Sequence, residues 1–378
     1  MARQTRTVRI GGNYHIHEVP IGGTHPVVIQ TMWKEKLDFP DSGIIGRLEN
    51  LERMGAKLIR FAVPSIEAAE TLGELAKAVP IPLVADIHFD YKIALRVLDF
   101  PIAKLRLNPG NISIKNRVFK VLEKAGKQGV PVRIGINAGS LPADLRARVE
   151  TGELRRAEAL VNAAERELAF FDEARFKDVV VSMKASSVPE TIEANRIFAG
   201  RNDAPLHIGV TEAGPLTAGL VRSAAALYPL LCEGIGDTVR VSLSDSAENE
   251  VIAAREILGC ADETAGYQNA LQKDGVHAEN RCKGARGVRL VSCPRCGRCG
   301  FDTHAFTARW QERLYALQKN ITIAVMGCVV NGPGEAREAD LGITGAGEKA
   351  LIFKRGKIAR AVDVKDADSA FEEELRGL

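Results

Sequence analysis

The sequence has no apolar run of about 18 residues, the length that a transmembrane helix needs, so we expect no membrane span. Its basic first residues are not followed by an apolar segment, and we therefore expect no secretory signal peptide. Neither sign of charge dominates, because 51 lysines and arginines oppose 48 aspartates and glutamates. This balance gives no reason to expect a nucleic acid or a membrane surface as a partner. The sequence also has no repeat of solenoid period and no low-complexity tract, which argues against a repeat protein.

The composition is that of an ordinary soluble globular protein, with 46% hydrophobic and 26% charged residues. At about 150 residues per domain, the 378 residues predict two or three domains. There are seven cysteines, an odd number, and four of them lie late in the chain. Without an export signal we expect a reducing, cytoplasmic location, where clustered cysteines bind metal or act in catalysis rather than form disulfides.

Eight short apolar runs predict the architecture of the first 250 residues. Such runs are typical of strands that are buried on both faces of a parallel sheet, and stretches with helical spacing separate them. The runs are 27–32, 58–63, 82–88, 102–107, 131–136, 179–184, 206–211 and 238–243. Eight strand–helix units predict an α/β fold, a (β/α)₈ TIM barrel. A doubly wound open sheet is the alternative, but no glycine-rich dinucleotide loop follows the first strand. The pairs Gly11-Gly12 and Gly22-Gly23 precede that strand and predict a hairpin or a lid.

From about residue 260 the pattern becomes that of a compact α+β module. Apolar segments at 287–294 and 321–328 predict strands, and a helix is expected near 305–318. A hairpin that turns at Arg355-Gly356 and an acidic helix complete the chain. We therefore expect two domains, a barrel over 1–259 and a smaller α+β domain over 260–378.

Polar side chains stand at the carboxyl ends of the predicted barrel strands, where TIM barrels have their active sites. Five are cations from five different strands, namely Arg60, Arg106, Arg133, Lys184 and Arg240. Like charges gather around an anion, because two charges at 4 Å interact by about 4 kcal/mol at an effective dielectric constant near 20. Phosphate or diphosphate suits arginine best, although a local ion pair is the alternative for any single arginine. Glu212, next to Thr211, could donate or accept a proton.

Cysteines form a second cluster. Cys293, Cys296 and Cys299 lie in the segment SCPRCGRCG, and Cys328 follows in GCVVNGPGEA. The spacing alone fits a Cys₄ zinc site and an iron–sulfur cluster equally well. The turn NGPG returns Glu335 toward Cys328. A carboxylate beside three cysteines favours a cluster that keeps one exchangeable iron.

The sequence resembles the bacterial 4-hydroxy-3-methylbut-2-enyl diphosphate synthase family of the non-mevalonate isoprenoid pathway over nearly its whole length. The motifs that carry the resemblance are GCVVNGPGEA, SCPRCG, HIGVTEAGP, EGIGDTVRVSLS, RLNPGN and RIGIN. The resemblance implies an oxidoreductase that reduces 2-C-methyl-D-erythritol 2,4-cyclodiphosphate by two electrons, with opening of the ring and loss of a hydroxyl. It further implies one [4Fe–4S] cluster per chain, ferredoxin or flavodoxin as the electron donor, and a homodimer.

The resemblance also implies site residues, motif by motif. The cluster ligands would be Cys293, Cys296, Cys328 and Glu335. The substrate-binding residues would be Arg60, Arg106, Asn108, Arg133, Asn137, Lys184, Thr211, Arg240 and Ser242. Glu212 would be the acid–base carboxylate.

Two features depart from the family pattern. Trp33, Lys34 and Glu35 follow Met32, where Thr and Asn are frequent in the family, and Cys299 is an additional thiol. Two other interpretations remain. One is a barrel with a zinc ribbon that binds a phosphorylated ligand without redox chemistry. The other is a radical S-adenosylmethionine barrel, which the cysteine spacing and position disfavour.

Overall fold

The computed structural model describes residues 3–37, 41–87, 90–107, 115–271, 281–282, 287–294, 300–328, 336–346 and 348–378. The chain divides into two compact units, Met1–Ala285 and Arg286–Leu378. Helix α9 (Ala247–Leu271) continues through residue 259, where the sequence placed the domain boundary. The two units therefore separate later than expected, because the helix after the eighth strand is longer than its apolar pattern indicated.

The first unit is a nearly closed barrel. Among its described residues, eight parallel strands pair in the order β8-β7-β6-β5-β4-β3-β10-β9, and a parallel bridge between Val181 and Leu206 links the two ends of this order. The strands are β3 (Val28–Met32), β4 (Ala56–Ala62), β5 (Leu83–Ile87), β6 (Lys104–Leu107), β7 (Val132–Asn137), β8 (Val179–Lys184), β9 (His207–Ile208) and β10 (Thr238–Val239). Each predicted run overlaps one of these strands. The TIM-barrel prediction is confirmed.

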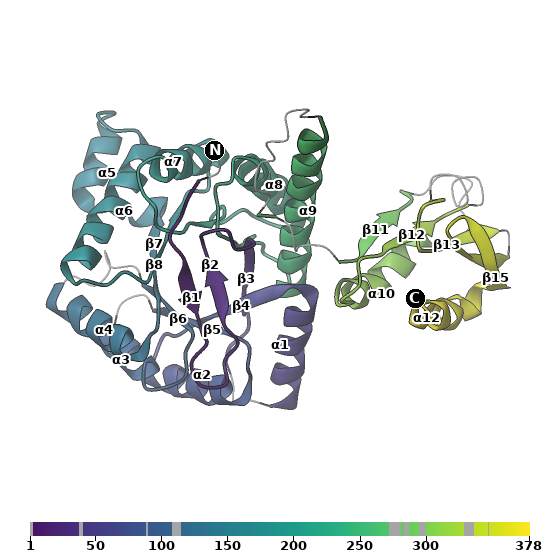
Figure 1. The fold of residues 1–378 in the computed structure, drawn as a ribbon, viewed down its shortest axis with the longest axis horizontal. Helices are drawn as coiled ribbons and strands as arrows, with labels where there is room; N and C mark the ends of the chain where they lie inside the picture. Colours follow the sequence, from purple (N-terminus) through teal and green to yellow (C-terminus); the bar gives the residue numbers. More distant parts are fainter. Residues whose placement is uncertain are drawn as a thin grey trace. The chain divides into compact units, whose positions relative to one another are not determined.

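Helices surround the strands in chain order (Figure 1). They are α1 (Ser42–Met54), α2 (Ile66–Ala78), α3 (Tyr91–Val97), α4 (Lys115–Gln128), α5 (Ala143–Glu150), α6 (Arg156–Glu173), α7 (Val188–Ala199), α8 (Leu216–Cys232) and α9. Their ends follow local chemistry. The Ser65 side chain caps α2 by accepting from the amide of Ala68 at 3.2 Å, and α1 ends at Gly55, as the sequence indicated. No helix in the described ranges is long and apolar enough to cross a membrane.

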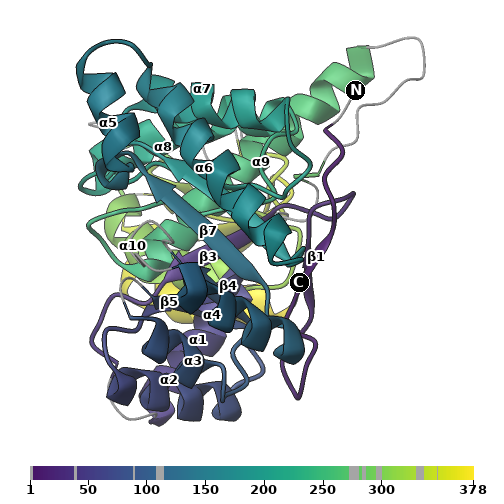
Figure 2. The same cartoon turned by 90° about the vertical axis from the view of Figure 1, so that its left-hand side faces the viewer.

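A hairpin closes the amino end of the barrel. Strands β1 (Val8–Ile10) and β2 (Val19–Ile21) pair antiparallel, and the two glycine pairs lie at their ends. Their apolar side chains pack against residues near the start of the barrel strands, such as Val28 and Val84. Figures 1 and 2 show the hairpin at one end of the barrel. The hairpin prediction is confirmed, and the opposite, carboxyl end is left to the polar side chains.

The second unit is an α+β domain, as expected. Its described residues form a five-stranded sheet in the order β11-β12-β13-β14-β15, parallel from β11 to β13 and antiparallel beyond. The strands are β11 (Arg289–Ser292), β12 (Thr322–Met326), β13 (Leu341–Ala346), β14 (Lys349–Lys354) and β15 (Lys357–Asp363). Helices α10 (Thr303–Tyr315) and α12 (Ala367–Arg376) pack on the sheet through a core that includes Phe306, Trp310 and Phe371. The hairpin turns at Arg355 and Gly356, where the sequence placed it.

Candidate active site

The five strand-end cations converge inside the barrel. Arg106 and Arg133 lie side by side in the register of β6 and β7, and both side chains are buried. Two motif glycines make room for the cations. A Cβ atom on Gly135 would lie 2.5 Å from Nε of Arg106, and one on Gly209 would lie 2.7 Å from Nζ of Lys184. The glycines of RIGIN and HIGVTEAGP thus allow long cationic side chains to fill the barrel next to bare backbone.

Two buried carboxylates pair with three of these cations. Asp86 at the end of β5 accepts from Nη1 of Arg106 at 3.0 Å, and its other oxygen lies 3.5 Å from Nε of Arg60. Glu250 on α9 accepts from Nε and Nη2 of Arg240 at 3.1 and 2.9 Å. Local ion pairs, the alternative that we considered for single arginines, therefore occur. Among the described residues they do not balance the cluster, because five cations face two carboxylates.

The other two cations form no ion pair within the described part of the chain. Arg133 donates Nη1 to the hydroxyl of Ser182 at 2.7 Å, while its buried Nε and Nη2 donate to no described group. Burial lowers the pKa of Arg133 well below its usual value, and the charges of Arg60 and Arg106 lower it further. Burial and neighbouring cations also lower the pKa of Lys184. Burial of several like charges destabilises the fold when no anion is bound. A bound anion would accept hydrogen bonds from Nε and Nη2 of Arg133.

Lys104 adds a further buried cation that the sequence analysis missed. It donates to Oε1 of Gln30 at 3.0 Å, and burial together with Arg133 and Arg60 lowers its pKa well below the usual range. Lys104 precedes Arg106 by two residues on β6. Alternation along a strand puts both side chains on the same face, so the signal was present in the run KLRL.

A hydrogen-bonded chain positions Lys184. Its Nζ lies 3.1 Å from Nε2 of His207, whose Nδ1 lies 2.6 Å from the hydroxyl of Thr238. A charged Lys184 can only donate, and Nε2 is then the acceptor of a neutral imidazole. Burial lowers the pKa of His207 well below its usual value, and the charge of Lys184 lowers it further. His207 could not be identified from the sequence, because a single histidine at the start of a strand has no distinguishing pattern.

Glu212 lines a separate part of the carboxyl end. It borders a pocket of about 690 Å³ together with Asn137, Thr211 and Ser186, and helices α5 and α6 contribute Arg146 and Arg156. Glu212 is exposed and has a backbone φ of 52°, a conformation that costs a non-glycine residue of order 1 kcal/mol. Strained residues of this kind concentrate at functional sites. The structure thus brings Glu212, Thr211 and Asn137 together.

Two further residues, Ser242 and Asn108, are expected to bind the substrate. Ser242 is half-buried and follows Arg240 by two residues. Asn108 lies outside the described residues.

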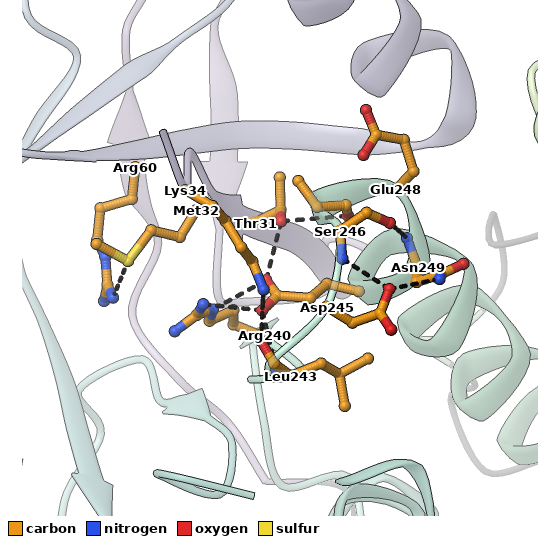
Figure 3. Close-up of polar contacts among 12 residues, drawn as sticks. Thr31, Met32, Lys34, Arg60, Arg240, Leu243, Asp245, Ser246, Glu248 and Asn249 are labelled. Carbon is orange, nitrogen blue, oxygen red and sulfur yellow. Dashed lines mark hydrogen bonds and ion pairs between the residues drawn. The ribbon is translucent and has the colours of Figure 1, made fainter. Parts of the chain in front are cut away.

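Glu250 is a site residue that the sequence analysis did not name. Its carboxylate also accepts from the Thr31 hydroxyl at 3.0 Å and from the Leu243 amide at 3.0 Å. Figure 3 shows Thr31, Lys34, Arg240 and Leu243 around this part of the site. Glu250 therefore fixes the end of β3, the segment after β10 and the Arg240 side chain to one another.

Cys293 and Cys328 of the second unit lie at one edge of its sheet. Cys293 directly follows β11, and Cys328 lies two residues after β12, the parallel neighbour of β11. The Cys293 amide donates to the carbonyl of Val325 at 2.9 Å. The Gly300 amide donates to the carbonyl of Gly327 at 2.9 Å. Cys293 and Gly300, the described residues with hydrogen bonds on either side of Cys296 and Cys299, therefore lie beside β12 and the residue that follows it.

The donor set is compatible with an iron–sulfur cluster. Cys296, Cys299 and Glu335 lie outside the described residues, and within those residues no three metal-ligating side chains form a group. Ala336, which follows Glu335, packs in one apolar cluster with Met326 and Cys293. The segments that carry the remaining candidate ligands thus start or end next to Cys293 and Cys328, and thiolates are the usual ligands of iron–sulfur clusters.

Comparison with known proteins identifies the family. The GcpE TIM-barrel domain model matches residues 5–255, and the GcpE protein C-terminal domain model matches residues 289–377. Relatives named 4-hydroxy-3-methylbut-2-en-1-yl diphosphate synthase (flavodoxin) include one from Treponema pallidum, which is 51% identical over 99% of this chain and 92% of the relative. Those from Treponema denticola and Thermodesulfovibrio yellowstonii are 48% and 42% identical, each over 99% of this chain and at least 98% of the relative.

The chain belongs to the 4-hydroxy-3-methylbut-2-en-1-yl diphosphate synthase family. The resemblance inferred from the motifs is confirmed, and so is the prediction of an oxidoreductase of isoprenoid biosynthesis. The zinc-ribbon binding protein finds no support in these matches. In this synthase family member, the cation cluster lies in the matched barrel domain, and Cys293 and Cys328 lie in the matched C-terminal domain.

The buried cations of this synthase should lower the stability of the fold and strengthen the binding of an anion. Replacement of Arg133 by methionine is expected to raise the thermal unfolding midpoint, because a desolvated charge next to Arg60 and Arg106 is removed. The same variant should bind diphosphate about 10- to 100-fold more weakly, since each lost charged hydrogen bond costs about 1.5–3 kcal/mol. Calorimetric titration and thermal unfolding measure both effects. Arg96→Met, which removes an exposed arginine, is the control. Unchanged diphosphate affinity in Arg133→Met would remove Arg133 from the anion site.

The neutral state of His207 predicts a pH dependence of stability. The unfolded chain takes up a proton at His207 near pH 6.5, whereas the folded state resists protonation. The unfolded state therefore binds more protons than the folded state below about pH 6.5. As the pH is lowered, the free energy of unfolding decreases by up to about 1.4 kcal/mol per pH unit. In His207→Gln the thermal unfolding midpoint should change less with pH between about pH 6.5 and pH 5.5 than in the wild type. The exposed His17 provides the control, His17→Gln, and equal slopes in all three proteins would contradict the neutral assignment.

Proposed function

We propose that the chain converts 2-C-methyl-D-erythritol 2,4-cyclodiphosphate into 4-hydroxy-3-methylbut-2-enyl diphosphate. Two electrons and two protons enter, the cyclic diphosphate opens, and a hydroxyl leaves as water. The observation that carries the proposal is the surplus of buried cations in the barrel. Nε and Nη2 of Arg133, moreover, have no hydrogen-bond acceptor among the described residues. A diphosphate offers the charge and the acceptor oxygens that these donors need. The names of the family relatives support the same reaction.

In this proposal the barrel binds the diphosphate and fixes its orientation. Arg60, Arg106, Arg133, Lys184 and Arg240 supply charged donors, and Asn108, Asn137, Thr211 and Ser242 supply neutral ones. The motif glycines leave room for the buried side chains of Arg106 and Lys184, which are already packed in the barrel, so little side-chain entropy is lost on binding. Asp86 and Glu250 hold three of the five cations apart in defined positions.

Glu212 would donate the proton that the departing hydroxyl needs. Its place in the pocket beside Thr211 and Asn137, the residue that pairs with Lys184 in the register of β7 and β8, supports this role. A positioned acid lowers the barrier because the hydroxyl leaves as water rather than as hydroxide.

One [4Fe–4S] cluster per chain would be held by Cys293, Cys296, Cys328 and Glu335. When bound, the cluster would supply the electrons for the reduction. The thiols at neighbouring strand ends support this assignment. We further propose flavodoxin as the electron donor, which the names of the relatives support, with ferredoxin as the alternative. A cytoplasmic location is part of the proposal, since thiolate ligands require a reducing compartment. The proposal also includes a homodimer, which the family resemblance implies.

An anaerobic preparation of the full chain tests the proposed function. Iron and sulfide analysis should give about four of each per chain. Reduced flavodoxin should be oxidised only when the cyclic diphosphate is present, with the allylic diphosphate as the product. A preparation that contains zinc without sulfide, or a loaded protein that leaves the cyclic diphosphate unchanged, would contradict the proposal.

A further inference from the structure

Lys34 reaches from the loop after β3 to the segment after β10. Its Nζ donates to the carbonyl oxygen of Leu243 at 2.5 Å and lies 2.7 Å from Oε1 of Glu250. The side chain is 24% exposed, which puts the ammonium group at the border between the barrel interior and solvent. Figure 3 shows it next to Arg240. Lys34 thus extends the cation cluster from the loop after β3, a strand that supplies none of the other five cations.

The loop holds Lys34 in a fixed position. The preceding Trp33 is buried, and its ring stacks on Phe61 with the centroids 5.7 Å apart. The guanidinium of Arg47 lies 4.9 Å from the centroid of the same ring. The Trp33 amide donates to the carbonyl of Arg60 at 2.9 Å. Because the backbone is anchored on both sides of the indole, the ammonium group is preorganised, and a ligand would lose little affinity to loop ordering.

Glu250 pairs with two cations at once. Its side chain is 1% exposed and already accepts two hydrogen bonds from Arg240. Lys34 is the second cation on the same carboxylate, and its charge also acts on Asp245 and Glu248. An ammonium group has three N–H donors, and the described residues use two of those on Lys34. A purely structural ion pair with Glu250 would be complete with Arg240 alone.

We infer that Lys34 is an additional anion-binding residue of the barrel site, held in position by Glu250, and that it contacts the diphosphate of the substrate. The inference rests on the proposed function. Arg240, its partner on Glu250, lies within electrostatic range of Arg60, Arg133 and Lys184. An anion bound by these cations therefore lies near Arg240, which shares the Glu250 carboxylate with Lys34.

The test uses the anaerobically purified full chain with its cluster. Lys34→Met should raise the KM for the cyclic diphosphate about 10- to 100-fold and change kcat by less than about threefold. Inhibition by inorganic diphosphate should weaken by a similar factor. Lys34→Arg should restore most of both values, because a guanidinium can reach the same acceptors. Lys127→Met removes an exposed lysine that pairs with Glu123 and controls for the change in net charge.

Two results would overturn the inference. If Lys34→Met lowers the unfolding midpoint but leaves both the KM and the diphosphate inhibition unchanged, Lys34 is structural only. If Lys127→Met weakens diphosphate inhibition as much as Lys34→Met does, the effect is one of net charge. A wild-type protein that carries its cluster but does not reduce the cyclic diphosphate would instead refute the proposed function, and direct titration with inorganic diphosphate would still test Lys34.

Discussion

Serine in place of Cys293, Cys296 or Cys328 is expected to abolish both the iron–sulfur cluster and turnover. A serine hydroxyl is a harder donor than a thiolate and is protonated at neutral pH, so it is a poor ligand for iron in a cluster. Cys293 and Cys328 stand at the ends of the parallel neighbours β11 and β12. Loss of either thiol would leave two thiolates and one carboxylate of the four proposed ligands.

Cys299→Ser provides the matched control for these variants. Cys296 and Cys299 lie in the same short segment, and each is a candidate for the same cluster. We expect Cys299→Ser to keep its iron and most of its activity, because Glu335 is the fourth ligand in our proposal. A carboxylate binds iron more weakly than a thiolate and can be displaced. Glu335→Ala should therefore give a labile cluster and little turnover.

Iron content, sulfide content and the anaerobic absorption spectrum measure the outcome independently of activity. Iron at the wild-type level in Cys299→Ser and its loss in the other three cysteine variants would support the ligand set. The reverse pattern, with iron lost from Cys299→Ser and full activity in Glu335→Ala, would make Cys299 the fourth ligand. Thermal unfolding of each variant identifies any general loss of folding.

The barrel could be predicted because its signals are local. Each strand is a short apolar run, and caps such as Ser65 and stops such as Gly55 mark the helix ends. The domain boundary could not be placed with the same accuracy. Gly259 resembles a helix stop in the sequence, but it lies inside α9, which continues to Leu271.

The site was only partly predictable for a similar reason. Strand ends in a parallel barrel lie together whatever the intervening sequence, so the convergence of five cations could be expected from their positions. Glu250 could not be found in this way, because it lies on a helix, in a stretch where Glu248 is equally acidic. Glu250 is distinguished by its tertiary contacts, because its side chain is buried against Arg240 and Thr31. The sequence of a helix does not specify such a contact.

Glutamine in place of Glu212 is expected to lower kcat about 10²- to 10⁴-fold, the usual contribution of a positioned acid or base. Glutamine keeps the size and the hydrogen-bonding ability of the side chain but cannot donate and regain a proton. The KM for the cyclic diphosphate should change little, since the charged donors that bind the diphosphate are retained. Steady-state kinetics with reduced flavodoxin and iron analysis of the same preparation measure these quantities.

Glu150→Gln is the control that isolates the proton transfer from the charge of the pocket. Glu150 lies on α5 and lines the same pocket as Glu212, so both variants remove one negative charge from the same cavity. We expect Glu150→Gln to keep kcat within a few-fold of wild type. If the two variants lose equal activity, the pocket needs negative charge rather than an acid at Glu212. If Glu212→Gln turns over at a near-normal rate, another group supplies the proton, because a glutamine at that position cannot.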